Sequence, residues 1–189
     1  MAAWEKLLVW RDMEVISDLE VEFVRYLKNL SQDLEDEVLL AAAACIHAQG
    51  KGPLCLDLSN EAEGSFLFDS KETGILLKEN TLQSWIAALK ESGGVSMNGS
   101  LQPMVLEDKR LYLQRLWKYE EELIKWFTDR AKISNTVDKN ISEIISNLPT
   151  GKEDLFEVNW QEVSVCLSFL KDLVVISGGP GTGTTYTVL

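Results

Sequence analysis

Apolar residues recur every three or four positions in the first half of the chain, which predicts helices. Ser17 or Asp18 can cap the first of them, and further helices are expected over residues 35–49 and 81–92. Gly50 ends the second pattern, as glycine commonly does at a helix C-terminus. The residues expected on the buried faces are Leu19, Phe23, Tyr26, Leu27 and Leu30 in the first helix, Val38, Leu39, Ala42 and Ile46 in the second, and Leu82, Trp85, Ile86 and Leu89 in the third.

Two short apolar stretches around a polar turn predict a β-hairpin over residues 103–106 and 110–113. Residues 53–58 alternate between apolar and polar and predict another short strand, whereas residues 59–80 carry little pattern and are expected to be loop with a short helix. The fold class of the N-terminal domain is therefore mainly α with a small β-hairpin, in the α+β class.

A long helix is expected from Gln114 to about Lys132, with Leu116, Trp117, Leu123, Ile124 and Phe127 on one face, and a shorter helix over residues 138–148. Residues 149–154 combine a proline, a glycine and four polar residues, which indicates a linker. The sequence thus predicts an N-terminal domain over 1–148 and a linker over 149–158.

A second domain is expected to begin at residue 159. Asn159 can cap a helix over residues 160–170, and the wholly apolar residues 173–176 predict a buried parallel strand. Because a phosphate-binding loop pattern over residues 178–185 follows this strand, we interpret residues 159–189 as the opening of an α/β, RecA-like motor domain, truncated after its first strand and loop.

The loop after this strand has the frame of a P-loop, G-x-x-x-x-G-K-[ST], over residues 178–185. Its glycines can direct backbone N–H groups at a phosphate, and Thr185 stands at the position that binds Mg²⁺. Thr184 replaces the lysine and cannot supply a cation, so no catalytic residue is assigned. A glycine-rich turn without a ligand is the alternative. The expected cofactors are ATP and Mg²⁺, with Gly178, Gly179, Pro180, Gly181, Thr182, Gly183, Thr184 and Thr185 as binding residues.

Charge and cysteine usage narrow the function classes. The net charge of −12 disfavours this segment as the main nucleic-acid-binding surface. Three widely spaced cysteines without a C-x-x-C motif disfavour both a zinc site and a disulfide framework. The lone His47 is expected to be packed or at a helix end. The N-terminus does not read as a signal peptide and no apolar run is long enough for a membrane, so we expect a cytoplasmic protein.

Several segments resemble the RecD family, the alpha subunits of the RecBCD enzyme, exodeoxyribonuclease V. Residues 159–163 and 175–183 resemble the opening of its motor domain, and residues 40–59 and 103–117 resemble its N-terminal domain. The resemblance implies a superfamily 1 DNA helicase that moves 5′ to 3′ on single-stranded DNA with ATP, in double-strand break repair and recombination. It also implies RecB-like and RecC-like partners, with the N-terminal domain docked on RecC.

The resemblance adds one residue to the nucleotide site. Gln161 matches the position of a glutamine that reads adenine ahead of the P-loop, and an amide can pair bidentately with adenine. A surface glutamine on a helix is the alternative.

The leading hypothesis is therefore the N-terminal portion of a helicase subunit. Its parent is an ATP-hydrolysing enzyme that meets single-stranded DNA through other regions, whereas this fragment is a protein-interaction domain, inactive because it is truncated and carries Thr184. The alternatives are a stand-alone degenerate nucleotide-binding regulatory protein, which would bind Mg-ATP without partners, and a purely structural helical domain. The aromatic candidates for partner contact are Trp4, Trp10, Trp85, Trp117, Trp126, Trp160 and Tyr112, although core packing is favoured for each.

Overall fold

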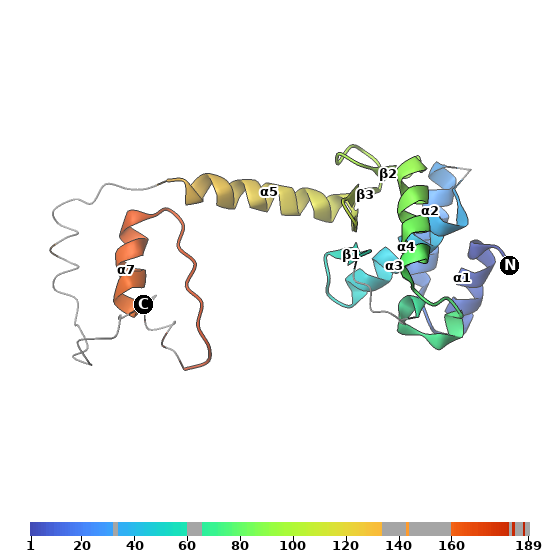
Figure 1. The fold of residues 1–189 in the computed structure, drawn as a ribbon, viewed down its shortest axis with the longest axis horizontal. Coiled ribbons are helices and arrows are strands. Elements are labelled where there is room, and N and C mark those ends of the chain that lie inside the picture. The colour runs from blue at the N-terminus through green and yellow to red at the C-terminus, as the bar shows by residue number, and fades with distance from the viewer. Residues whose placement is uncertain are drawn as a thin grey trace. The chain divides into compact units, whose positions relative to one another are not determined.

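The structure, a computed structural model, describes residues 1–31, 34–59, 66–133, 143, 160–181, 183 and 187. The chain packs as two units, residues 1–120 and 121–189. The described helices are α1 (Ala3–Asp12), α2 (Asp18–Leu30), α3 (Asp36–Gly50), α4 (Glu79–Glu91), α5 (Gln114–Ala131) and α7 (Trp160–Leu170), with the 3₁₀ helices η1 (Leu67–Asp69) and η2 (Lys71–Thr73) (Figure 1). The strands are β1 (Cys55–Asp57), β2 (Val95–Ser96), β3 (Met104–Glu107) and β4 (Arg110–Leu113).

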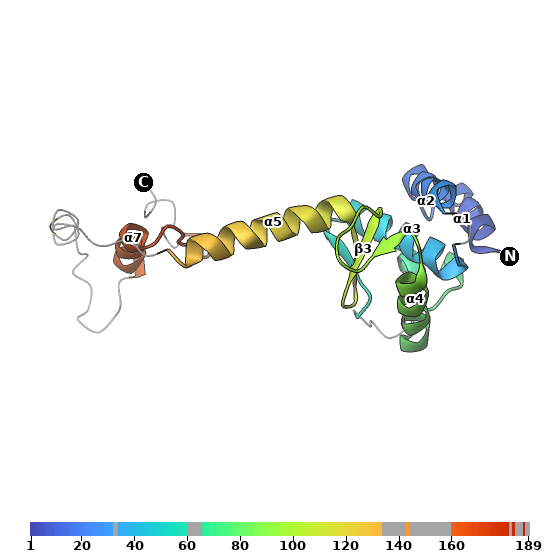
Figure 2. The same cartoon turned by 90° about the horizontal axis from the view of Figure 1, so that it is seen from above.

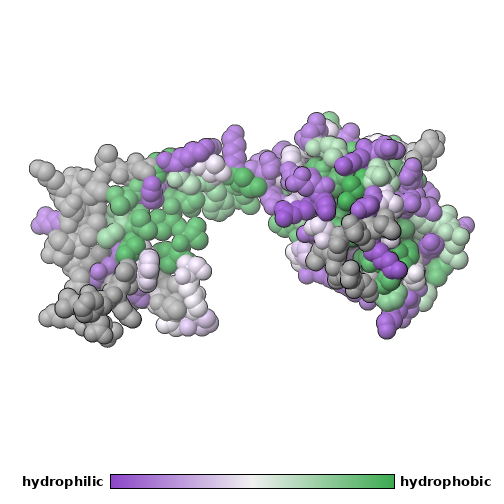
Figure 3. Space-filling model, viewed as in Figure 1, coloured by the Kyte–Doolittle hydropathy of each residue, from purple (hydrophilic) through white to green (hydrophobic). Residues whose placement is uncertain are grey.

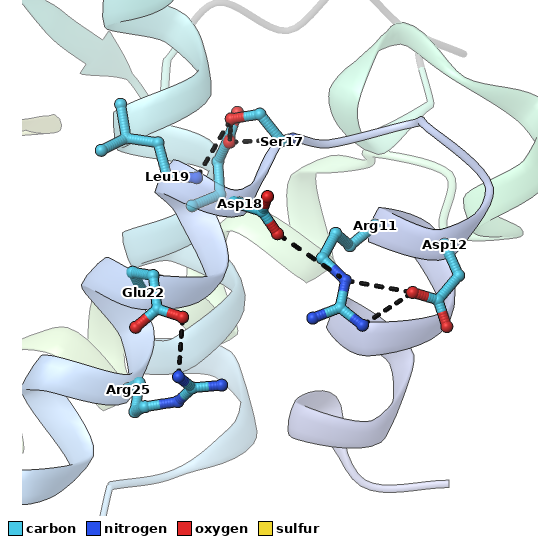
Figure 4. A network of polar contacts seen from close by, with 8 residues as sticks. Arg11, Asp12, Ser17, Asp18, Leu19, Glu22 and Arg25 are labelled. Carbon is cyan, nitrogen blue, oxygen red and sulfur yellow. Dashed lines mark hydrogen bonds and ion pairs between the residues drawn. The ribbon is translucent and has the colours of Figure 1, made fainter.

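Ser17 caps α2, which settles the choice between Ser17 and Asp18. The Ser17 hydroxyl accepts a hydrogen bond from the Leu19 backbone N–H at 3.2 Å, and the Ser17 N–H donates to Glu20 Oε2 at 3.0 Å. This reciprocal capping box satisfies N–H groups that have no partner within the helix. Figure 4 shows the cap beside Arg11 of α1, whose guanidinium lies 2.7 Å from Asp12 and 3.9 Å from Asp18.

The predicted buried face of α2 is wrong apart from Leu27 and the half-buried Phe23. Leu19, Tyr26 and Leu30 are 65%, 51% and 56% exposed. The face turned inward instead carries Glu20, Val21, Val24 and Leu27. Two overlapping sets of positions on this helix have helical spacing, so periodicity could not choose between them. In the observed rotation the Glu20 carboxylate bonds to both Ser17 and His47, and Val21, Val24 and Leu27 pack in the core.

Helix α3 forms the centre of the N-terminal unit. Residues Val38 to Ile46 are all buried, so the helix is covered on every side and not on one face as predicted. It packs against α1, α2, α4, β1 and β4. The alanine run over residues 41–44 makes this possible, because short side chains let neighbouring elements approach closely.

A mixed four-stranded sheet lies beside these helices (Figure 2), in the order β1-β4-β3-β2. The predicted hairpin is confirmed: β3 and β4 are antiparallel, and Glu107 pairs with Arg110 across a two-residue turn. The predicted strand over residues 53–58 is confirmed in shorter form as β1, antiparallel to β4. β2 pairs parallel to β3 and was not predicted, because two residues are too short to show a period.

Helix α5 confirms the prediction of a long helix, but it has no buried residue. Leu123, Ile124 and Phe127 on its apolar face are 56%, 51% and 44% exposed. Hydrophobic residues are accordingly visible along this helix in the space-filling view (Figure 3). In the described part of the chain, no helix has the length and apolarity needed to cross a membrane.

The second unit confirms the predicted helix α7 over residues 160–170. Residues 173–176 do not form the predicted buried strand, and Val175 is 78% exposed. A strand needs a neighbour for its backbone groups, and residues 160–181 provide none to this run. The predicted helix over 138–148, Glu143 aside, and the linker over 149–158 lie outside the described residues, so the domain boundary stays a prediction.

Candidate functional site

The second unit brings Gln161 and Gly183 together. Gln161 lies in the first turn of α7, and Gly183 belongs to the glycine-rich loop. A β-carbon built on Gly183 would lie only 2.4 Å from Gln161 Nε2. The amide therefore lies directly against the loop backbone, at a position that has room for glycine alone unless the amide shifts.

Two described glycines of the loop have a left-handed backbone conformation. Gly181 and Gly183 adopt φ values of 85° and 77°, a left-handed region that other residues rarely enter. The Thr187 backbone N–H and hydroxyl both donate to the Gly183 carbonyl at 3.0 Å. The backbone bond has the four-residue spacing of an α-helical turn, and Thr187 itself is helical, whereas residues 184–186 lie outside the described part of the chain.

The remaining predicted loop residues divide into two groups. Gly178, Gly179 and Pro180 are described and exposed to solvent. Thr182, Thr184 and Thr185 lie outside the described residues, so the magnesium and lysine positions stay predictions. The described glycines fit a phosphate group, but the sequence places a neutral threonine where the charge of a triphosphate needs a cation.

A pocket of about 360 Å³ borders this loop, and sequence reasoning did not identify it. Two of its polar groups are already bonded within α7, since Ser164 and Ser168 donate to the carbonyls of Trp160 and Val165 at 2.7 Å. Thr187 joins the pocket to the loop through its bonds to Gly183. The lining residues are Ser164, Val165, Ser168, Lys171, Asp172, Val174, Ile176 and Thr187.

In the first unit, the titratable pair Glu20 and His47 is structural. His47 Nδ1 lies 3.0 Å from Glu20 Oε1, and the His47 ring meets Phe68 edge-on with centroids 5.1 Å apart. Burial raises the pKa of Glu20, but hydrogen bonds from Ser17 and His47 outweigh it and leave the pKa below its ordinary value of 4.5. This confirms His47 as a packed histidine near a helix end.

Some of the aromatic candidates for partner contact are buried and others are exposed. Trp10, Trp85 and Tyr112 are buried in the core. Trp160 and Trp126 are 72% and 46% exposed, and the Arg130 guanidinium lies 4.4 Å from the Trp126 ring centroid. Among the described residues of the first unit, the most exposed large apolar side chain is not aromatic: Leu101 is 98% exposed, and a search for aromatic anchors could not find it.

Comparison with known proteins gives the family. The model of the N-terminal domain of RecBCD enzyme subunit RecD matches residues 12–112, most of the first unit. RecBCD enzyme subunit RecD of Buchnera aphidicola subsp. Acyrthosiphon pisum is 24% identical over 181 residues, or 94% of this chain and 29% of the relative. The RecD subunit of Mycobacterium tuberculosis is 27% identical over 177 residues, or 92% of this chain and 27% of the relative.

A third relative, the RecD subunit of Haemophilus influenzae, is 30% identical over 92 residues, or 47% of this chain and 14% of the relative. The chain therefore spans less than a third of the length of the curated relatives that it matches. The family model covers more than half of the chain, and its segment includes α2, α3, α4 and all of the sheet except the last residue of β4. The chain belongs to the RecD family.

Proposed function

We propose that this chain is the N-terminal part of an ATP-dependent DNA helicase subunit in a RecBCD-type helicase–nuclease. The observation that carries the proposal is the family match over residues 12–112, which coincides with a unit that has its own core. In this proposal the whole protein moves 5′ to 3′ on single-stranded DNA during double-strand break repair and recombination, and works in the cytoplasm.

Within that enzyme, the first unit serves as the protein-interaction domain. Its described residues offer a packed core and several exposed apolar side chains, with no group of three or more His, Cys, Asp or Glu that could hold a metal ion. We place it on a RecC-like subunit, beside a RecB-like subunit. The acidic surface supports protein contact over nucleic-acid contact, because the phosphate backbone repels negative charge.

The second unit supplies the start of a nucleotide site. Gln161 would contact adenine, the glycines of residues 178–183 would hold the phosphates, and Thr185 would bind Mg²⁺. The contact between Gln161 and Gly183 supports this assignment, because it joins both ends of the proposed site. Bound Mg-ATP would supply the energy for translocation in the whole protein, whereas the fragment with Thr184 is expected to be inactive.

Co-purification tests the interaction role. The chain is mixed with the RecB-like and RecC-like subunits of the same organism, singly and together, and the mixtures are separated by size-exclusion chromatography. We expect co-elution with the RecC-like subunit alone and with the pair, and none with the RecB-like subunit alone. A folded chain that elutes alone in every mixture would contradict the proposal.

The second candidate is a stand-alone degenerate nucleotide-binding regulatory protein. It is favoured by the same Gln161–Gly183 contact, which does not depend on a partner. Calorimetric titration of the isolated chain with Mg-ATP separates the two candidates. Tight binding by the isolated chain together with no subunit binding would support the regulator over the helicase subunit.

A further inference from the structure

The loop over residues 97–103 presents an apolar side chain to solvent. It joins β2 to β3 and is the yellow-green trace beside the label β2 in Figure 1. Leu101 in this loop is 98% exposed, and Met97 is 51% exposed. An isolated exposed leucine is ordinary on a protein surface, so its meaning depends on how the loop around it is built.

The loop is held in place from within. The hydroxyl of the buried Ser96 accepts hydrogen bonds from the N–H groups of Asn98 at 3.1 Å and Ser100 at 2.9 Å. Gly99, with φ of 71°, lies so close to the Trp117 ring that an added β-carbon would be 1.9 Å from it. Leu101 is therefore displayed by an ordered loop, and little conformational entropy remains to be lost on binding.

The end of the loop is fixed as well. The Gln114 N–H at the start of α5 donates to the Pro103 carbonyl at 2.9 Å. The backbone on both sides of Leu101 is thus anchored to the sheet or to the helix that follows it. A partner would meet a preformed projection and not a segment that must fold on contact.

A groove of about 410 Å³ lies next to this projection. Gly93 and Gly94 contribute to it without side chains, and Leu30 at the end of α2, which is 56% exposed, contributes a second apolar side chain. The lining residues are Leu30, Ser31, Gly93, Gly94, Ser100, Leu101, Gln102 and Pro103. None of these described lining residues is charged, so an apolar group that contacts them would not bury an unpaired charge of theirs.

Acidic residues lie close to the groove. Leu34 would lie 3.7 Å from a β-carbon on Gly94, and the next two residues, Glu35 and Asp36, are exposed. Glu91 at the end of α4 is exposed two residues before Gly93. Lys90, beside Glu91, is also exposed, but the three acidic residues outnumber it. With a net charge of −12 on the chain, these surroundings favour a cationic partner and disfavour a phosphate backbone.

We propose that Leu101 and the adjoining groove are the point at which this domain docks on its partner subunit. The partner presents an apolar side chain to Leu101 and Leu30, with lysine or arginine beside it facing Glu35 and Glu91. This assignment rests on the proposed function and names the surface that carries it out. A few residues commonly carry most of the binding free energy of an interface, surrounded by contacts that mainly exclude water.

The test compares two exposed leucines of the same domain. Leu101→Lys puts a positive charge opposite the cationic residues of the proposed partner. Leu19→Lys makes the same change at the start of α2, away from Leu30 and the groove, where the side chain is 65% exposed. Both variants should keep the wild-type melting temperature. We expect Leu101→Lys to raise the Kd for the RecC-like subunit at least tenfold, Leu101→Met to restore affinity, and Leu19→Lys to have no effect.

The role of Glu35 and Glu91 is tested by measuring the rate of association with the partner subunit. Glu35→Lys combined with Glu91→Lys should slow association several-fold at low salt, with the effect fading as salt screens the surface. Unchanged association at low salt would overturn the electrostatic part of the assignment.

The remaining outcomes separate the two proposals. Wild-type affinity in Leu101→Lys would overturn the docking site and leave the proposed function intact. A wild-type chain that binds neither subunit would overturn both. A wild-type chain that dimerises, with Leu101→Lys monomeric, would overturn the partner assignment in favour of a second copy of this chain.

Discussion

Glu20 Oε1 on α2 lies 3.0 Å from His47 Nδ1 in the last turn of α3. The Glu20 side chain is only 7% exposed, and the same carboxylate accepts a hydrogen bond from the N-cap residue Ser17. One buried acid therefore joins the start of α2 to the end of α3. Removing the Glu20 carboxylate should therefore lower the free energy of unfolding more than removing one of the exposed acids would.

We expect Glu20→Gln to lower the free energy of unfolding by about 1–3 kcal/mol at neutral pH, because bonds to a buried charge are lost. Since hydrogen bonds leave the pKa of Glu20 below its ordinary value of 4.5, this carboxylate stabilises the fold above pH 4.5. That contribution is lost as the pH falls through the folded pKa. Urea unfolding of the wild type and of Glu20→Gln across this pH range measures the effect. The difference between their free energies of unfolding should shrink in acid.

Glu22→Gln is the matched control for this measurement. Glu22 lies on the same helix and pairs with Arg25 at 2.7 Å, but its side chain is 56% exposed. Exposed pairs contribute little, so the change should be within about 0.5 kcal/mol. Equal losses in the two variants would show that the contact between Glu20 and His47 is not what stabilises α2.

Gly99 should be the least replaceable of three glycines. In Gly99→Ala the new methyl group would meet the Trp117 ring, and φ is 71°, so we expect a loss of about 1–3 kcal/mol. Gly74→Ala carries only the backbone strain, with φ of 65° and no atom within 4 Å. Gly50→Ala has neither penalty and ends a helix, so it should be neutral or stabilising by up to about 1 kcal/mol.

Thermal and urea unfolding of the three glycine variants would give this order directly. If Gly99→Ala were no more destabilised than Gly74→Ala, the Trp117 ring would have moved aside without cost. The loop that carries Leu101 would then be less firmly anchored than the contact implies.

The cysteines should differ sharply in reactivity. Burial raises the pKa of Cys45 to about 12, and its thiol donates to the Leu111 carbonyl at 3.3 Å. Burial also raises the pKa of Cys55, but that residue is only partly buried. Near pH 8, iodoacetamide should label Cys55 in the folded protein and leave Cys45 unmodified until denaturant is added, as peptide mass spectrometry can show.

Thr184→Lys should restore ATP hydrolysis in a version that carries the rest of the motor domain. The lysine would supply the positive charge at the transferring phosphate, so we expect the DNA-dependent ATPase rate to rise about 100-fold or more. Thr184→Met, which adds length without charge, is the control and should stay inactive. An inactive lysine variant, with DNA and both partner subunits present, would count against a helicase parent.

Much of the helical framework could be predicted from sequence, because capping and periodicity are local signals. Ser17 was a correct cap candidate, and the β3–β4 hairpin followed from its polar turn. The rotation of α2 could not be predicted, since Leu19 and Val21 belong to overlapping apolar sets. Long-range contacts choose between the sets, namely the packing of Val21 in the core and the bond from Glu20 to His47.

For the glycine-rich loop, the sequence predicted the residues of a site but not the local structure. These residues were assigned from the motif and stay predictions, and the structure adds only that Gln161 lies against Gly183. The expected strand over residues 173–176 did not form, because a parallel strand depends on neighbours that residues 160–181 do not offer. Leu101 was missed because an exposed loop leucine leaves no periodic signal; only the fold reveals it.

Helix α3 has no side open to water from Val38 to Ile46, and one of the elements that cover it, β4, ends at residue 113. During synthesis from the N-terminus, α3 leaves the ribosome long before that cover exists. The nascent chain therefore exposes an apolar segment until β4 emerges. Such a segment is prone to aggregate and is a target for chaperones. A premature stop anywhere between the two would yield an aggregation-prone fragment and not a smaller working domain.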